Sequence, residues 1–221
     1  MSTYTAVTQQ GPSDLESLAE NGFQLQVALS VAGSDANPSF NVVYQSPPLA
    51  PNMNVSWTTN YGLNWTTEPV RPGTQVIYAG NWQSCGLGES YNLDNVGDWV
   101  PEQNNPNANP KALNVGKSGY GTGVNIVVGV QDVMGRWRPI WVSPDQLLQG
   151  GGGQYEPLQT VQLWYQQGQN EGTIVSSQET PIERFDYNTI AASNNNTEYF
   201  SYDIQAGQWE EPQSFPFRNL N

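Results

Sequence analysis

The sequence predicts an all-β protein, an antiparallel β-sandwich with one short N-terminal helix. Three observations lead to this class: apolar and polar residues alternate with a period of two in several segments, turn residues separate those segments, and helical periodicity is nearly absent. The 221 residues suffice for one large β-domain, 1–221, or for two β-rich sub-domains, 1–100 and 120–221, joined by a loop rich in Asn, Pro and Gly.

The helix is expected near the start of the chain. Ser13 followed by Glu16 has the spacing of a capping box, and Gly22 is a stop signal. We therefore expect a helix from Asp14 to Asn21. A second, brief helical turn is expected after Ser143, because the next residue, Pro144, suits the first position of a helix.

The strongest strand signal covers residues 23–32, where large apolar residues alternate with Gln, Ala and Ser, as in a strand with one buried face. Gln24 and Gln26 are therefore expected to face solvent. Residues 124–130 give the second strongest signal. Shorter segments show the same pattern: Phe40, Val42 and Tyr44; Met53, Val55 and Trp57; Val161, Leu163 and Tyr165; Phe200, Tyr202 and Ile204.

Three further expectations concern a hairpin, a long loop and the hydrophobic core. Trp57 and Trp65 flank Gly62, which suggests a hairpin between them. The segment 81–123 is rich in Gly, Asn and Pro, and a loop of this length is either a binding loop or a linker. Four residues on the apolar faces of the strongest strands are predicted to be core residues: Val27, Leu29, Ile126 and Val128.

The charge of the chain argues against several partners. Twenty acidic residues against seven Lys and Arg give a net charge of -13. Nucleic acids and anionic membranes require basic patches, so we predict neither as a partner. No apolar run approaches the roughly 20 residues of a transmembrane segment, and none is predicted. No signal peptide is visible, so a cytoplasmic protein or one exported by a non-classical route is expected.

The chain also lacks the residues of several common catalytic sites. It has no His, which excludes Ser-His-Asp triads, Cys-His pairs and His-ligated metals. Cys85 is the one cysteine, so no internal disulfide forms, and an inert buried thiol is expected. A glycosidase with two carboxylates remains an alternative. No glycosidase strand motif is found around the acids, so no catalytic residue is predicted.

Carbohydrate binding fits the composition better. A sugar site needs aromatic rings that stack on C–H faces and polar groups that pair with hydroxyls. The segment 81–123 offers both, and its candidates are Trp82, Tyr91, Asn92, Asp94, Asp98 and Trp99. Secondary candidates are Trp57, Tyr61, Asn64, Trp65 and Trp209. The alternative for every one of these Trp residues is a place in the core.

No cofactor is predicted, and a calcium site is the alternative. Asp94, Asn95 and Asp98 lie close together with Glu89 nearby, and calcium prefers clustered oxygen ligands on a loop. The spacing does not complete an EF-hand series. Because Asp and Asn are also ordinary turn residues, the same cluster fits a simple turn.

The general character of the chain is similar to that of cytosolic defence lectins from fungal fruiting bodies, with scarce Cys, short strands and loops rich in Asn and Trp. It has neither the repeated Gln-x-Trp motif of β-trefoil lectins nor the aromatic cluster of actinoporin-like toxins. We therefore expect a non-enzymatic, lectin-like protein that binds glycans as a homodimer, since single sugar sites are weak. A pore-forming or toxic defence protein and a structural interaction protein are the alternatives.

Overall fold

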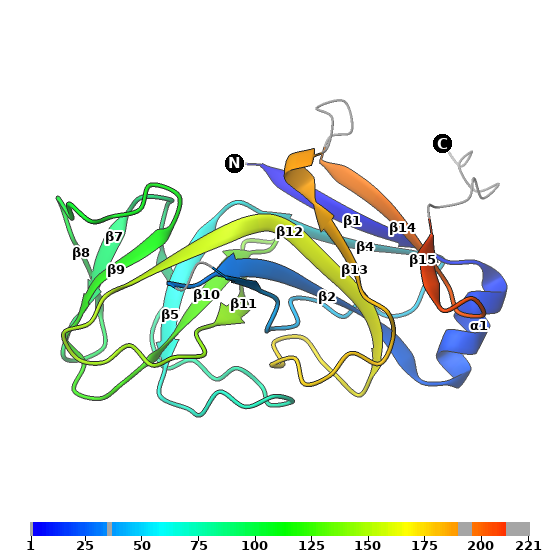
Figure 1. Cartoon of the computed structure of the whole chain (residues 1–221), viewed down its shortest axis with the longest axis horizontal. Helices are drawn as coiled ribbons and strands as arrows, with labels where there is room; N and C mark the ends of the chain where they lie inside the picture. The colour runs from blue at the N-terminus through cyan, green and yellow to red at the C-terminus, as the bar shows by residue number, and fades with distance from the viewer. Residues whose placement is uncertain (1, 35–36, 190–195, 211–221) are drawn as a thin grey trace.

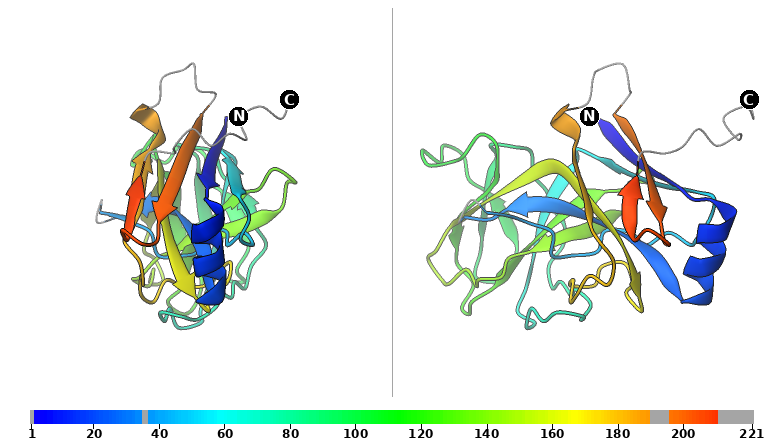
Figure 2. Two further views of the ribbon diagram at one scale, coloured as in Figure 1. Left: turned by 90° about the vertical axis from the view of Figure 1, so that its right-hand side faces the viewer. Right: turned by 45° about the vertical axis from the view of Figure 1, so that its right-hand side comes forward.

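The computed structural model describes residues 2–34, 37–189 and 196–210. Over these residues the chain is mostly β, with three open sheets in a sandwich-like arrangement and one short helix, α1 (Pro12–Glu20), as predicted (Figure 1). A 3-10 turn (Tyr187–Thr189) follows the thirteenth strand. Figure 2 shows α1 at one end of the molecule.

Two of the three sheets have four strands each. The first has the order β15-β14-β1-β4, with bounds β1 (Thr3–Gln9), β4 (Asn52–Thr58), β14 (Thr197–Asp203) and β15 (Gln208–Glu210). The second has the order β11-β10-β5-β6, with bounds β5 (Tyr61–Thr66), β6 (Gln83–Ser84), β10 (Asn125–Gln131) and β11 (Trp137–Val142).

The third sheet has seven strands in the order β3-β2-β12-β9-β7-β8, with β13 also paired to β12. Its longest strand is β12, which arches across the front of the molecule beside β2 (Figure 1). The bounds are β2 (Phe23–Ala32), β3 (Pro38–Ser39), β7 (Ser90–Leu93), β8 (Trp99–Pro101), β9 (Leu113–Ser118), β12 (Gly153–Gln167) and β13 (Glu183–Asp186).

Strands far apart in the sequence pair within each sheet. β1 pairs with β14, β5 with β10, and β2 with β12. The segment 81–123 contains β6, β7, β8 and β9, and β9 pairs with β12. Two pairings, β1–β14 and β7–β9, are parallel, whereas the other pairings between named strands of the described chain are antiparallel.

The main hydrophobic core lies between the seven-stranded sheet and the two smaller sheets. All three sheets contribute buried side chains to it, among them Leu29, Val55, Ile126 and Leu163. The prediction that Val27, Leu29, Ile126 and Val128 are core residues is confirmed, since none is more than 3% exposed. The alternating segments at Met53–Trp57 and Val161–Tyr165 also form strands with buried apolar residues.

The expectation of a single buried face on β2 is wrong. Gln26 and Ser30, on the face expected to meet solvent, are 0% exposed, although Gln24 is exposed. The reason is a second layer of chain on that face, because Ala28 and Trp164 pack there in a cluster with Val43. Alternation reports which face is more apolar, and small or amide side chains on the other face can still be buried.

The helix begins earlier than its sequence signals indicate. Pro12 occupies its first position and Gly11 is the N-cap, with no side chain capping the helix, so the capping box expected at Ser13 does not form. Proline suits that position because its missing N–H would have no helical partner there. The predicted stop is confirmed, since α1 ends at Glu20 and Gly22 adopts φ +68°.

Two short elements expected from the sequence do not form. Residues 40–44 make one isolated bridge, from Val42 to Ile174, and their successive side chains pack in separate clusters: Val42, Val43 and Tyr44 each belong to a different one. No helical turn begins at Pro144, since the chain bends at Pro144 and Asp145 and Leu147 then forms a bridge with Val124.

The hairpin expected between Trp57 and Trp65 is also replaced by a different connection. The two Trp residues lie on β4 and β5, which belong to different sheets, so the chain crosses from one sheet to another at residues 59–60. Gly62 lies inside β5, directly opposite Gly129 of β10.

The turn between β10 and β11 is organised by the buried carboxylate of Asp132, which is 4% exposed. It accepts hydrogen bonds from the backbone N–H groups of Met134 and Arg136, each at 2.9 Å, and from the Arg138 guanidinium at 3.3 Å. Burial alone would raise the pKa of the Asp132 carboxyl, but these donors outweigh it and hold the pKa below its usual value.

We predict that Leu29→Ala and Ile126→Ala each lower the free energy of unfolding by about 2–4 kcal/mol, because each leaves a cavity in the main core. Gln24→Ala should change it by less than about 0.5 kcal/mol. Gln26→Ala should cost more than Gln24→Ala, since its buried amide donates to Ser46 Oγ at 2.9 Å. Urea denaturation measures all four; equal costs at positions 24 and 26 would contradict the two-sided burial of β2.

We predict that Asp132→Asn costs about 1.5–3 kcal/mol at pH 7, the scale of a hydrogen bond to a charged group. A carboxyl whose pKa is lowered by folding stabilises the fold above its unfolded pKa of about 4, and this contribution is lost as pH falls through the folded value. The difference between wild type and variant should therefore narrow below about pH 4 in urea titrations. Asp186→Asn, an exposed carboxylate that accepts one backbone N–H, is the control and should show a smaller loss.

Candidate functional site

The six leading candidates from the sequence lie in two places. Tyr91 and Asn92 are on β7, Asp94 and Asp98 are in the following turn, and Trp99 begins β8. Tyr91 and Trp99 pack against the main core. The sixth, Trp82, precedes β6 and packs instead against a separate cluster that contains Val127 and Val142. The structure therefore groups five of the candidates in one hairpin and puts Trp82 elsewhere.

Within that hairpin the acidic residues build the turn. Oδ1 of Asp94 accepts hydrogen bonds from the backbone N–H groups of Val96 and Asp98, each at 2.9 Å. These bonds lower the pKa of the Asp94 carboxyl, the bond from Asp98 most strongly. In the described chain no group of three or more Asp, Glu or Cys side chains is placed to hold a metal ion. The geometry thus gives the cluster around Asp94 the role of a turn.

The aromatic residues of the hairpin are half-buried. The hydroxyl of Tyr91 lies 3.5 Å from Oε2 of Glu89, and burial together with that carboxylate raises the Tyr91 pKa. Nε1 of Trp99 and Oδ1 of Asn92 are buried and have no hydrogen-bond partner among the described residues. The indole of Trp99 therefore points its polar edge inward, and only part of the ring is accessible to a ligand.

Four of the five secondary candidates are enclosed in the fold. Trp57 is 1% exposed and lies between Tyr4 and Tyr187, at 5.9 and 5.2 Å between ring centroids. Tyr61, Asn64 and Trp65 are at most 5% exposed. These four side chains pack inside the fold, and none of them lines the hollows described below. Trp209 is half-buried, stacks on Tyr165 at 5.8 Å and donates from Nε1 to the carbonyl of Pro181 at 2.9 Å.

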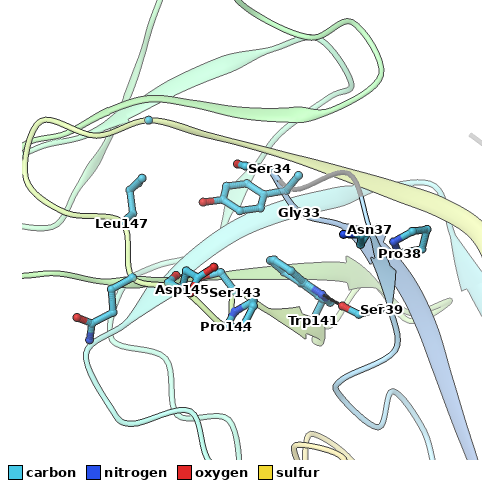
Figure 3. A pocket seen from close by; sticks show the side chains of 13 residues that line it. Gly33, Ser34, Asn37, Pro38, Ser39, Trp141, Ser143, Pro144, Asp145 and Leu147 are labelled. Atoms are coloured by element: carbon cyan, nitrogen blue, oxygen red, sulfur yellow. Dashed lines mark hydrogen bonds between the residues drawn. The ribbon is translucent and has the colours of Figure 1, made fainter.

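A hollow of about 350 Å³ lies where the β2–β3 connection, the segment after β11 and the start of β12 converge. We call it the Trp141 hollow. Figure 3 shows Pro144 and Asp145 on one side of the Trp141 indole and Ser39 on the other. Its lining is Gly33, Ser34, Asn37, Pro38, Ser39, Trp141, Ser143, Pro144, Asp145, Gln146, Leu147, Gly152 and Tyr155.

Two aromatic rings form the apolar part of this hollow. The rings of Trp141 and Tyr155 lie 5.6 Å apart at 51°, and Nε1 of Trp141 donates to Oγ of Ser39 at 2.7 Å. That hydrogen bond fixes the indole between β11 and β3. Burial raises the pKa of the Tyr155 hydroxyl, which therefore stays protonated and can donate a hydrogen bond at neutral pH.

The polar part of the hollow is a rim of hydroxyl, amide and carboxylate groups. Ser143 shapes it, because its Oγ accepts from the N–H of Ile126 at 2.8 Å and donates to the carbonyl of Asp145 at 2.9 Å. The side chains of Asp145 and Gln146 are exposed at the edge. None of the described residues that line the hollow is Lys or Arg, and Asp145 is the one charged residue there.

A second hollow, of about 430 Å³, adjoins the first and shares Ser34 and Gly152 with it. Asparagine side chains and Gln154 line much of it, and it contains no charged residue from the described chain. Sequence reasoning missed the Trp141 hollow, because its residues come from widely separated segments, and the available signal was the concentration of Ser, Pro, Gly and Asn at 33–39 and 143–153. The second hollow includes Asn105, Asn107 and Asn114 of the segment 81–123, for which a binding loop was one of two expectations, although none of these residues was a candidate.

No family model matches the chain, and neither a curated protein nor a solved structure matches it. In the described part of the chain no helix has the length and hydrophobicity needed to cross a bilayer. The function therefore has to be argued from the chemistry of the hollows and of the aromatic surfaces.

A contact between Trp65 and Gly97 holds the β7–β8 hairpin against β5. Nε1 of Trp65 donates to the carbonyl of Gly97 at 2.9 Å, and a Cβ at Gly97 would lie 2.5 Å from the Trp65 ring. Gly97 also has φ +95°, whereas Gly135 has φ +77° with open space around its Cβ position. The two glycines therefore separate backbone strain from crowding.

We predict that Gly97→Ala destabilises the protein by roughly 2–6 kcal/mol, because strain at positive φ and overpacking each cost about 1–3 kcal/mol. Gly135→Ala should cost only the strain at positive φ, because no atom crowds its Cβ position. Thermal and urea denaturation of both variants measure the difference. Equal losses would mean that the hairpin moves away from Trp65 without cost.

Proposed function

We propose that this protein binds neutral carbohydrates without catalysis and that the Trp141 hollow is the binding site. The observation that carries the proposal is the combination of two aromatic rings, a rim of hydroxyl and amide groups, and the absence of cations among the described lining residues. A sugar ring has apolar C–H faces and hydroxyl edges, so it needs both kinds of surface in one place.

The size of the hollow is consistent with a small ligand. Its volume of about 350 Å³ lies at the lower end of the range for small-molecule sites, about 300–1,000 Å³. Trp141 and Tyr155 are only 2% and 4% exposed, so a ligand meets the edges of these rings more than their faces. We therefore expect weak binding of single sugars, with a Kd of about 1 mM, which corresponds to about 4 kcal/mol.

The charges favour a neutral ligand over an acidic one. Sialic or uronic acids need a cation close to their carboxylate, and the hollow offers only the carboxylate of Asp145. That carboxylate is well suited to accept hydrogen bonds from two neighbouring hydroxyls of a neutral sugar. The net charge of -13 adds repulsion against any acidic glycan.

The glycosidase alternative finds less support. Such enzymes need two carboxylates across the bond that breaks, and the Trp141 hollow is lined by one, Asp145. Glu89 and Glu102 do line another hollow together, but Glu102 accepts from Ser90 Oγ and Glu89 from the N–H of Gly86, each at 2.7 Å. Burial, with the charge of Glu89, raises the pKa of Cys85 to about 12, so the thiol is not a nucleophile at neutral pH.

We predict that the double variant Asp145→Ala/Gln146→Ala loses most of the affinity of the Trp141 hollow for neutral sugars, because it removes the exposed hydrogen-bonding groups at the rim of the hollow. A glycan array identifies the ligand, and isothermal titration with the corresponding methyl glycoside measures the loss. EDTA should leave wild-type binding unchanged, since the proposed site uses no metal ion.

The matched control is Glu179→Ala/Gln178→Ala, which likewise removes one exposed acidic residue and one exposed glutamine, but outside the hollow. It should bind like the wild type. The hollow is not the site if the two double variants bind equally well, and the carbohydrate proposal fails if no neutral glycan binds the wild type at all.

A further inference from the structure

A second aromatic surface lies on the outer face of the sheet β11-β10-β5-β6, away from the main core. Gly62 of β5 and Gly129 of β10 are direct cross-strand partners there. Facing residues of an antiparallel pair put their Cβ positions on the same side of the sheet. Two neighbouring strands therefore present a patch without side chains.

Two indole rings lie on this patch. A Cβ at Gly62 would be 2.8 Å from the ring of Trp137, and a Cβ at Gly129 would overlap the ring of Trp82. The two indoles are stacked, with centroids 5.5 Å apart and planes 15° from parallel. Any larger residue at either glycine would force a ring off the sheet, so the glycine pair is what allows this geometry.

A tyrosine extends the aromatic surface. Tyr78 is 40% exposed, and its ring meets that of Trp82 edge to face at 5.1 Å and 62°. Trp82 and Trp137 are themselves half-buried, so part of each indole remains accessible to solvent. We call the surface formed by Tyr78, Trp82 and Trp137 the indole shelf. It is larger and more exposed than the aromatic wall of the Trp141 hollow.

Amide side chains flank the shelf, and the charged groups near it are paired. Asn60 donates to the amide oxygen of Gln131, which lies directly opposite Trp137 in the sheet. Arg138, the next residue along β11, is held by Asp132 at 3.3 Å and by Glu171. The shelf thus combines aromatic faces with amides, and its neighbouring cation is already neutralised.

We propose that the indole shelf is a second carbohydrate-binding site, in which the C–H face of a neutral sugar ring stacks on the exposed part of the indoles. This rests on the ligand class of the proposed function but not on the Trp141 hollow. The two sites share β11: Trp141 packs with the main core, whereas Trp82, the stacking partner of Trp137, packs with the outer cluster. One chain then binds two sugars on opposite faces of one sheet.

Stoichiometry tests this inference. Isothermal titration uses the methyl glycosides of glucose, galactose, mannose and N-acetylglucosamine, and the tightest of the four is carried forward. The wild type should bind two sugars per chain, and Trp137→Ala should bind one. Asp145→Ala/Gln146→Ala should also bind one, and the combined variant none. The sugar bound by Trp137→Ala through the hollow shows that this variant is folded.

Two further variants disturb the shelf without removing an indole. Gly129→Ala pushes a Cβ into the Trp82 ring, and it should abolish the second binding event although every aromatic residue is kept. Tyr78→Ala removes an exposed ring and should weaken that event roughly 2- to 10-fold, the range of one aromatic contact. Gly121→Ala, with open space around its Cβ position, is the control and should retain both events.

The outcomes separate the two proposals. A single binding event that survives Trp137→Ala and Gly129→Ala but is lost with Asp145→Ala/Gln146→Ala overturns the shelf and leaves the hollow. A single event with the opposite dependence supports the shelf and overturns the hollow. If none of the four glycosides and no glycan on an array binds, both proposals fail.

Discussion

The pairing of β2 with β12 is the constraint on which the rest of the structure depends. β12 is 15 residues long and pairs with β2, β9 and β13. Its register to β2 shifts between Pro157 and Val161, where proline cannot donate to a ladder, and the strand bends there. Side chains of β12 contact both smaller sheets, since the ring of Tyr155 meets Trp141 of β11 and that of Tyr165 meets Tyr202 of β14. The first residues of β12 include Tyr155, so the same strand also forms one wall of the Trp141 hollow.

Most of the fold follows from alternation, and its failures have a common cause. The pattern predicts the existence of β2, β4, β10, β12 and β14, and their large apolar residues are buried. It does not predict what covers the second face of a strand. Gln26 is buried because residues 40–43 and 175–182 cross the outer face of β2, and no local pattern encodes a contact between segments so far apart. Trp57 and Trp65 enter different sheets for the same reason, because the partners of their strands are far away in the sequence: β4 pairs with β1 and β5 with β10.

The candidate sites show more sharply what the sequence does not predict. A search along the sequence finds groups of residues that are neighbours in the chain, such as Asp94 to Trp99, and these prove to form a hairpin whose acidic residue makes a turn. The Trp141 hollow instead unites residues from three segments, and the indole shelf depends on Gly62 and Gly129. The sequence context of Gly62 suggested a hairpin instead, and nothing in the context of Gly129 marks it. The sequence marks Trp82 as a candidate because it is aromatic and lies in a loop-like segment. It does not mark Tyr78 and Trp137, the rings that Trp82 contacts.

The two proposed sites change the argument for oligomerisation. Weak single sites need multivalency for useful avidity, which from the sequence alone suggested a homodimer. A chain with one site on each face of the β11-β10-β5-β6 sheet already has two, and they face apart because Trp141 and Trp137 serve opposite sides of β11. Two sites that diverge cannot both engage one short glycan. If both sites bind as proposed, they join separate glycan chains, and cross-linking of a glycan-coated surface is favoured over tight binding of a single oligosaccharide without a second copy of the chain.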